Sequence, residues 1–135
     1  MQDTRATLRQ AIKGALSGFD DVKVCLLYGS AIQGRLRPDS DLDVAVASDT
    51  ALNHEQKMVL RSELERATGR EVDLLDLQSV SGPILHQALT KGEVVIVRDH
   101  LLYAGIMKRM IFNQTDMMPY YHRMLEARRR AFVAS

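Results

Sequence analysis

Two short groups of residues in this chain, ten positions apart, could do chemistry together. Gly29-Ser30 ends an apolar run, and Asp41-Leu42-Asp43 begins another. Alternate side chains of a strand share a face, so Asp41 and Asp43 would lie together while Leu42 points into a core. Two carboxylates this close repel each other unless a cation neutralises them, and carboxylate oxygens are ligands that Mg²⁺ takes in proteins. The second group therefore predicts a magnesium site.

Gly29-Ser30 would supply the other half of such a site. A glycine and a serine after a strand leave main-chain N–H groups free to face an anion, and a phosphate can approach glycine closely. The Ser30 hydroxyl would add a hydrogen bond. The competing interpretation makes Gly29-Ser30 a simple turn and residues 39–41 an acidic loop. The combination is specific, because this spacing should arise by chance in roughly one chain in a thousand of this length.

A third carboxylate could come from the run over residues 71–77, which contains Asp73 and Asp76. These two have opposite parity, so a regular strand cannot point both at the same face. Asp73 lies inside the apolar run, where an unpaired charge would be costly, whereas Asp76 lies near the strand end, where a turn role is easy. We expect Asp73 in the site, with Asp76 as the alternative.

The elements that must position these residues alternate along the chain. Apolar periodicity and capping residues predict helices over 8–16, 53–67 and 81–91 and strands over 22–28, 41–47, 71–77 and 94–97. Further helices are expected over 101–113 and 120–134, with an interruption at 116–119. This order predicts an α/β (α+β) fold in which helices pack on a sheet of about four strands. We expect one domain over 1–135, with its core at about 1–98 and a helical tail at about 100–135.

Bulk composition narrows the class of protein. Apolar residues make up 46% and charged residues 26%, as in soluble globular domains, and a net charge of +1 predicts no strongly basic nucleic-acid surface. Cys25 is the only cysteine, which excludes an intramolecular disulfide, and its apolar neighbours predict a buried, inert thiol. The sequence shows neither a signal-peptide pattern nor an apolar run long enough to span a membrane. We therefore expect a cytoplasmic protein that does not bind nucleic acid directly.

Gly29-Ser30, ten intervening residues and then Asp41-Leu42-Asp43 resemble the signature of the DNA polymerase β-type nucleotidyltransferase superfamily. The short chain and the residues Arg37-Pro38-Asp39-Ser40 before Asp41 are similar to its minimal nucleotidyltransferases, the MNT or MntA antitoxins encoded beside HEPN-domain toxins of the HepT type. The resemblance covers most of the chain in its order of elements, with the specific motifs between Gly29 and about Asp76. It implies a polymerase β-like nucleotidyltransferase fold with a small mixed sheet.

The resemblance also implies a two-metal nucleotidyl transfer. Asp41 and Asp43 would hold two Mg²⁺ ions, and Asp73 would bind the ion near the attacking hydroxyl. All three would thus be catalytic and metal-binding residues.

Nucleotide binding would fall to the residues before these carboxylates. Gly29 and Ser30 would hold the phosphates of ATP. Arg37, like Arg35, could reach a phosphate or a partner protein, or could be a solvated loop residue.

The implied acceptor is a tyrosine of a cognate HEPN-domain RNase toxin, which makes the chain an adenylylating antitoxin of a type VII-like pair, in a hetero-oligomer with its toxin. No large second domain follows the predicted catalytic strands, which fits an acceptor supplied by a partner. Two alternatives stay open: an antitoxin that only binds and masks its toxin, and a small-molecule nucleotidyltransferase of the aminoglycoside-modifying kind. The methionine-rich tail, with Arg128-Arg129-Arg130, could pack on the sheet or face a partner.

Overall fold

Helices and strands alternate along the chain. The computed structural model describes residues 4–29 and 41–116. In order, they form α1 (Thr4–Leu16), β1 (Val24–Tyr28), β2 (Leu42–Ala47), α2 (His54–Thr68), β3 (Val72–Asp76), α3 (Gly82–Lys91), β4 (Glu93–Val97) and α4 (His100–Asp116). No helix within these two ranges is long and apolar enough to cross a membrane.

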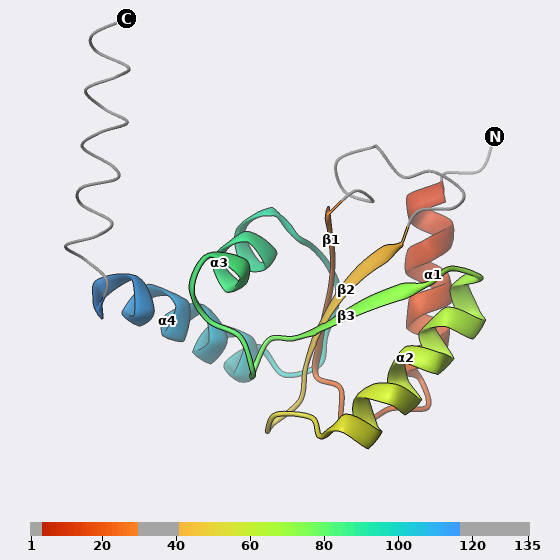
Figure 1. Ribbon diagram of the computed structural model, residues 1–135, viewed down its shortest axis with the longest axis horizontal. Coiled ribbons are helices and arrows are strands. Elements are labelled where there is room, and N and C mark those ends of the chain that lie inside the picture. The colour runs from red at the N-terminus through yellow and green to blue at the C-terminus, as the bar shows by residue number, and fades with distance from the viewer. Residues whose placement is uncertain (1–3, 30–40, 117–135) are drawn as a thin grey trace, which may run out of the picture.

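The four strands form one mixed sheet in the order β3-β2-β1-β4. Strand β1 runs antiparallel to both β2 and β4, whereas β2 and β3 are parallel and are joined by α2. Helices α1 and α2 lie on one face of the sheet and α3 and α4 on the other (Figure 1). The predicted α/β architecture with a small mixed sheet of four strands is confirmed. That all 135 residues form one domain stays a prediction.

Capping residues set the bounds of α2 as the sequence indicates. The Asn53 side chain accepts a hydrogen bond from the Gln56 N–H at 2.8 Å, and the Asn53 N–H donates to Gln56 Oε1 at 2.9 Å. This capping box satisfies two donors that the first turn of a helix otherwise leaves unpaired. Gly69 ends the helix in the left-handed conformation, at φ +69°.

Helix α4 is longer than predicted. It continues through Asp116, the first residue of the interruption predicted at 116–119, so that prediction is wrong at Asp116. The physical reason is that Pro119 restricts the residue directly before it, and Asp116 lies clear of that position. The predicted helix over 120–134 lies outside the described residues.

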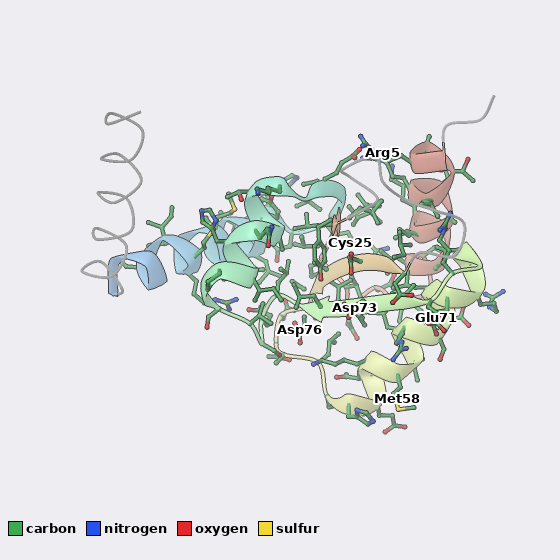
Figure 2. All side chains as sticks on the ribbon, turned by 45° about the horizontal axis from the view of Figure 1, so that its top comes forward. Arg5, Cys25, Met58, Glu71, Asp73 and Asp76 are labelled. Carbon is green, nitrogen blue, oxygen red and sulfur yellow. The ribbon has the colours of Figure 1, made fainter. Side chains whose placement is uncertain are left out.

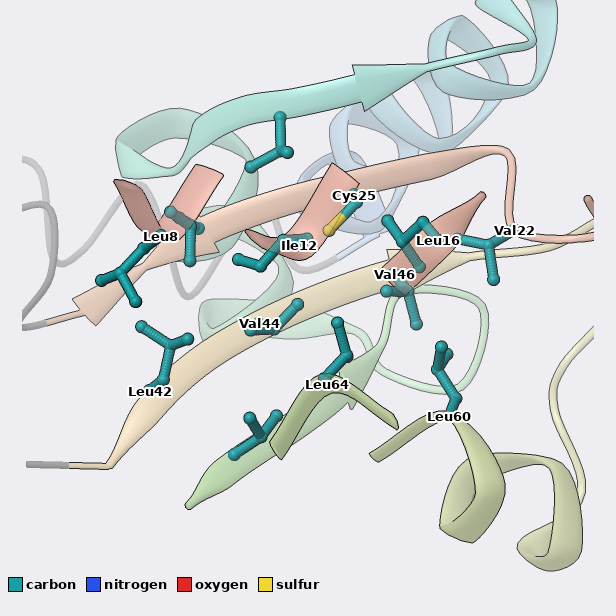
Figure 3. Close-up of a cluster of buried hydrophobic side chains, with 13 residues drawn as sticks. Leu8, Ile12, Leu16, Val22, Cys25, Leu42, Val44, Val46, Leu60 and Leu64 are labelled. Carbon is teal, nitrogen blue, oxygen red and sulfur yellow. The ribbon is translucent and has the colours of Figure 1, made fainter. Parts of the chain in front are cut away.

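One hydrophobic core lies between the sheet and helices α1 and α2 (Figure 3). Every second residue of β2 belongs to it, namely Leu42, Val44 and Val46, which confirms the predicted alternation. Cys25 is fully buried in the same core, and burial raises the pKa of its thiol to about 12. The expected buried thiol is therefore confirmed.

The second core lies on the opposite face and covers one half of it. Leu85 of α3 and Ile106 of α4 pack against strand residues that lie at one end of the sheet, namely Val24, Leu26, Ala45, Ala47 and Leu77. These are the first half of β1, the last half of β2 and the residue after β3. The other end of this face holds the polar residues described next.

Candidate active site

Three side chains lie side by side on the face of the sheet that α3 and α4 cover, and one of them, Tyr28, packs against the second core. Strand pairing places Tyr28 opposite Asp43 and Asp43 opposite Asp73. Residues two apart in a strand share a face, so these three lie on the same face as Leu26 and Ala45, which belong to the second core. We call Tyr28, Asp43 and Asp73 the polar rung. It is the point at which this face changes from hydrophobic to ionisable.

The surroundings of Asp43 disfavour its charged form. Burial raises its pKa, and the charges of Asp73 and Asp41 and a hydrogen bond with Asp73 raise it further. The pKa of Tyr28 is raised to about 12 by burial and then by the charges of Asp43 and Asp73. Like charges held this close favour either a proton or a bound cation. Two adjacent carboxylates are a donor set that suits a hard divalent cation such as Mg²⁺.

The three predicted carboxylates are not equally close. Within residues 4–29 and 41–116, no group of three histidine, cysteine or carboxylate side chains is placed to hold a metal. Asp43 and Asp73 lie opposite each other on β2 and β3, whereas Asp41 is exposed just before β2 begins. Because Asp41 precedes the strand, the alternation that predicted its direction does not govern it. The metal and catalytic roles of the three stay predictions.

Gly29 packs directly against Asp43. Its φ is +72°, a left-handed conformation that glycine adopts without steric cost. A Cβ added at Gly29 would collide with Asp43 Oδ2 and lie 3.0 Å from Asp43 Cγ. Backbone conformation and close packing thus both require glycine here, reasons that the sequence argument, based on phosphate access alone, did not contain.

The predicted nucleotide-binding residues after Gly29 are not described. Ser30, Arg35 and Arg37 lie outside the described residues, so their roles stay predictions. Tyr28, in contrast, is a site residue that sequence reasoning missed. The alternation of the strand shows which residues share a face with Tyr28, but its place beside Asp43 depends on which strands pair.

Asp76 has a structural role. It is only 2% exposed, and its carboxylate accepts hydrogen bonds from Leu52 N–H at 2.8 Å, Gln78 N–H at 2.9 Å and the Ser79 hydroxyl at 3.0 Å. These bonds tie the loop before α2 to the turn after β3. The turn role expected for Asp76 is confirmed, but the burial argument is wrong, since Asp73 is the exposed carboxylate and Asp76 the buried one. The choice of Asp73 as the third site carboxylate stays a prediction.

A groove with a volume of about 320 Å³ lies between α2 and β3, next to the polar rung. Asp41 and Asp73 are among the residues that line it. Met58 lines the groove from α2, and Glu71 lines it from the start of β3. Figure 2 shows Met58 on the helix side, with Glu71 and Asp73 along the strand and Asp76 toward its other end.

Comparison with known proteins adds the family context. Residues 10–101 match the family model described as "Polymerase beta, Nucleotidyltransferase". The protein adenylyltransferase MntA of Shewanella oneidensis is 33% identical over 82 residues, which make up 61% of this chain and 59% of MntA. The matched region thus spans less than two thirds of that relative.

Solved structures share the fold over nearly the whole chain. A crystal structure of a toxin–antitoxin with AMP-PNP matches at a TM-score of 0.68 and 24% identity, covering 87% of this chain and 98% of the other. A structure of tri-AMPylated Shewanella oneidensis HEPN toxin in complex with MNT antitoxin matches at 0.64 and 21%, covering 90% and 98%. The predicted polymerase β-like fold is confirmed.

Proposed function

We propose a protein adenylyltransferase activity for this chain, which belongs to the Polymerase beta, Nucleotidyltransferase family. The chain would transfer AMP from ATP to a tyrosine hydroxyl of a HEPN-domain RNase toxin, with release of diphosphate, and would act in the cytoplasm as the antitoxin in a complex with that toxin. The observation that carries this proposal is the pairing of Asp43 with Asp73 on neighbouring strands, with Gly29 packed against Asp43. Similarity to the protein adenylyltransferase MntA supports the choice of acceptor.

Mg²⁺ suits the carboxylate oxygens of Asp43 and Asp73, which lie opposite each other, and we propose that they hold two ions together with Asp41. When bound, the ions would offset charge on the triphosphate and favour ionisation of the acceptor hydroxyl. Asp43 supports this assignment, because burial raises its pKa and the charges of Asp73 and Asp41 raise it further, and a bound cation would offset those charges.

The remaining roles follow the order of residues along the site. The main chain at Gly29 and the hydroxyl of Ser30 would hold the phosphates that leave as diphosphate. Asp73, exposed at the edge strand, would lie nearest to the incoming hydroxyl. Arg37 would reach a phosphate from the loop before Asp41.

Transfer of label from [α-³²P]ATP tests the proposal, with Mg²⁺ and the purified product of the neighbouring gene as acceptor. We expect label on a tyrosine of that protein, no transfer in EDTA, and a loss of about 100-fold or more in Asp43→Asn and Asp73→Asn. Asp49→Asn is the matched control, since Asp49 is an exposed carboxylate just past the other end of β2. It should transfer at the wild-type rate.

Other outcomes would replace the proposal. If Asp43→Asn still protected cells from the toxin and no label moved in the wild type, the chain would neutralise by masking. If an aminoglycoside took up label without any protein partner, the chain would be a small-molecule nucleotidyltransferase.

A further inference from the structure

We propose that one side of α4 is a docking surface for an α-helix of the partner protein. The inference rests on the proposed function and adds to it a surface by which the chain holds its partner. Six exposed residues, three or four apart, form this side of the helix: Leu101, Ala104, Gly105, Lys108, Ile111 and Phe112. We call them the α4 stripe.

The α4 stripe exposes large apolar side chains on the side of the helix that is turned away from the core. Leu101 is 86% exposed and Phe112 is 56% exposed. Ile106 and Met110, on the opposite side of α4, are buried in the second core. A helix on the surface of a soluble domain normally presents an apolar side to the core and a polar side to water. Because α4 is largely apolar on both sides, the α4 stripe has the character of a surface that a second element covers.

Ala104 and Gly105 shape the middle of the α4 stripe. Glycine weakens the interior of a helix relative to alanine. Nothing in the described part of the chain requires glycine at residue 105, because a Cβ added there would have open space around it. The side chains at the contact set how closely two helices approach, and small ones allow a short distance between the axes. A helix of the partner therefore fits here, with a large side chain over Gly105 and apolar neighbours against Leu101 and Phe112.

Lys108 is the only charged member of the α4 stripe. Its ammonium lies 5.7 Å from the centre of the Phe112 ring, which is a cation–π contact. An apolar helix that carries one carboxylate would pair with this ammonium and leave the contact with Phe112 in place. We therefore expect an acidic residue among the apolar side chains of the partner helix.

The size of the α4 stripe favours a partner protein over a second copy of this chain. Leu101 and Phe112 are about 16 Å apart along the helix axis, and a helix is about 10 Å wide. Two copies packed through this strip alone would each bury on the order of 200 Å², well below the roughly 800 Å² per side of a stable interface. The α4 stripe is thus one part of a larger contact.

The position of α4 provides the rest of that contact. Helix α4 packs on the face of the sheet that carries the polar rung, whereas α1 and α2 lie on the other face. A protein that serves as acceptor at the polar rung approaches this face from solvent, and the α4 stripe is turned toward solvent on the same face. One partner can therefore cover both.

Gly105→Gln and Gly14→Gln form a matched pair of variants. Both glycines are exposed in helices and have open space around an added Cβ, but Gly14 lies in α1, on the other face of the sheet. Glutamine favours a helix more than glycine does, so both variants should melt at least as high as the wild type. Calorimetric titration without ATP would measure affinity for the purified product of the neighbouring gene. Sedimentation would measure the mass of each variant alone.

We expect Gly105→Gln to weaken partner binding by about tenfold or more, because the longer side chain holds the two helices apart, and Gly14→Gln to bind like the wild type. Leu101→Glu should weaken binding too. Val59→Glu puts the same charge on an exposed apolar position of α2 and should not. Affinity for a non-hydrolysable ATP analogue should be the same in all four variants. Wild-type partner binding in both Gly105→Gln and Leu101→Glu would overturn the inference.

Two further results would overturn it in favour of another occupant. A wild-type chain that is a dimer on its own, and a monomer as Gly105→Gln, would assign the α4 stripe to a second copy. A lower melting temperature in Gly105→Gln than in Gly14→Gln would assign it to another segment of the same chain.

Failure of the proposed function would look different. If the wild type transferred no AMP but Gly105→Gln still lost affinity for the partner, the docking surface would stand and the adenylyltransferase activity would fall. Label transfer by the wild type, with equal partner binding in every variant, would keep the activity and remove the docking surface. A wild-type chain that neither labels nor binds the partner would overturn both.

Discussion

Gly29→Ala is the substitution for which the structure makes the sharpest prediction. The added methyl group has two consequences at once. It forces a residue with a Cβ into the left-handed conformation at φ +72°, and it places that Cβ against the Asp43 carboxylate. Gly69→Ala is the matched control, because Gly69 has φ +69° and open space within 4 Å of the added Cβ. The difference between the two variants isolates the contact with Asp43.

The magnitudes follow from these geometries. A residue with a Cβ costs about 1–2 kcal/mol in the left-handed region, which corresponds to a fall of roughly 4–10 °C in melting temperature for a domain of this size. Both variants should show this loss. Only in Gly29→Ala must the Asp43 carboxyl also move, since its Cγ would lie 3.0 Å from the new Cβ and carbon atoms prefer about 3.5–4.0 Å. A displacement of about 1 Å in a catalytic group can lower a rate by about 100-fold.

Thermal melting and AMP transfer per folded molecule test this prediction together. We expect Gly69→Ala to melt lower but to transfer AMP at the wild-type rate, and Gly29→Ala to melt lower and lose about 100-fold in transfer. If Gly29→Ala kept the wild-type rate, then either Asp43 would have no part in catalysis or its position would be unimportant. Either result would refute the reasoning from the close contact.

Three further predictions concern residues outside the reaction itself. Asp76→Ala should lower the free energy of unfolding by about 2–3 kcal/mol, because it removes a buried carboxylate that accepts three part-buried hydrogen bonds. Asp73→Ala should change it by less than about 1 kcal/mol, and urea titrations would show the contrast. Arg98→Ala should lower the free energy of unfolding by about 2–3 kcal/mol in the same titration, because the Arg98 guanidinium donates to three main-chain carbonyls in and after α1. Its AMP transfer per folded molecule should not change. Arg98→Lys should restore only part of the lost stability. Iodoacetamide should label Cys25 only after unfolding. Because burial raises the pKa of its thiol from 9.0 to about 12, the stabilisation by the protonated thiol is complete below pH 9 and is lost as the pH rises toward 12. The melting temperature of Cys25→Ala should therefore depend less on pH over that interval.

Local sequence patterns predicted several of the residues placed together here, but they could not predict which strands pair. The alternation of β2 and the placing of Asp73 and Asp76 on opposite faces each needed only parity, which is a property of one strand. Tyr28 needed knowledge of which strand lies next to β1, and no local pattern contains that. Parity does not govern Asp41, because that residue lies one position before its strand begins.

The pairing of Asp43 with Asp73 depends on register as well as on strand order. Each is the second residue of its strand, and β2 and β3 are parallel, so equal positions come to lie side by side. A slip of β3 by one residue would bring Leu74 beside Asp43 and turn Asp73 toward the core under α1 and α2. The like charges of the two carboxylates oppose the correct register, so other contacts must hold it.

Those contacts come from both ends of β3. The Glu71 carbonyl accepts from the Leu42 N–H at 2.8 Å before the strand, and the Leu77 N–H donates to the Val46 carbonyl at 2.8 Å after it. Helix α2 adds a third contact, since Glu65 Oε2 accepts from the N–H of the first residue of β3 at 2.9 Å. The side chain of Glu65 therefore helps to keep Asp73 beside Asp43, because it holds the register of the edge strand that carries Asp73.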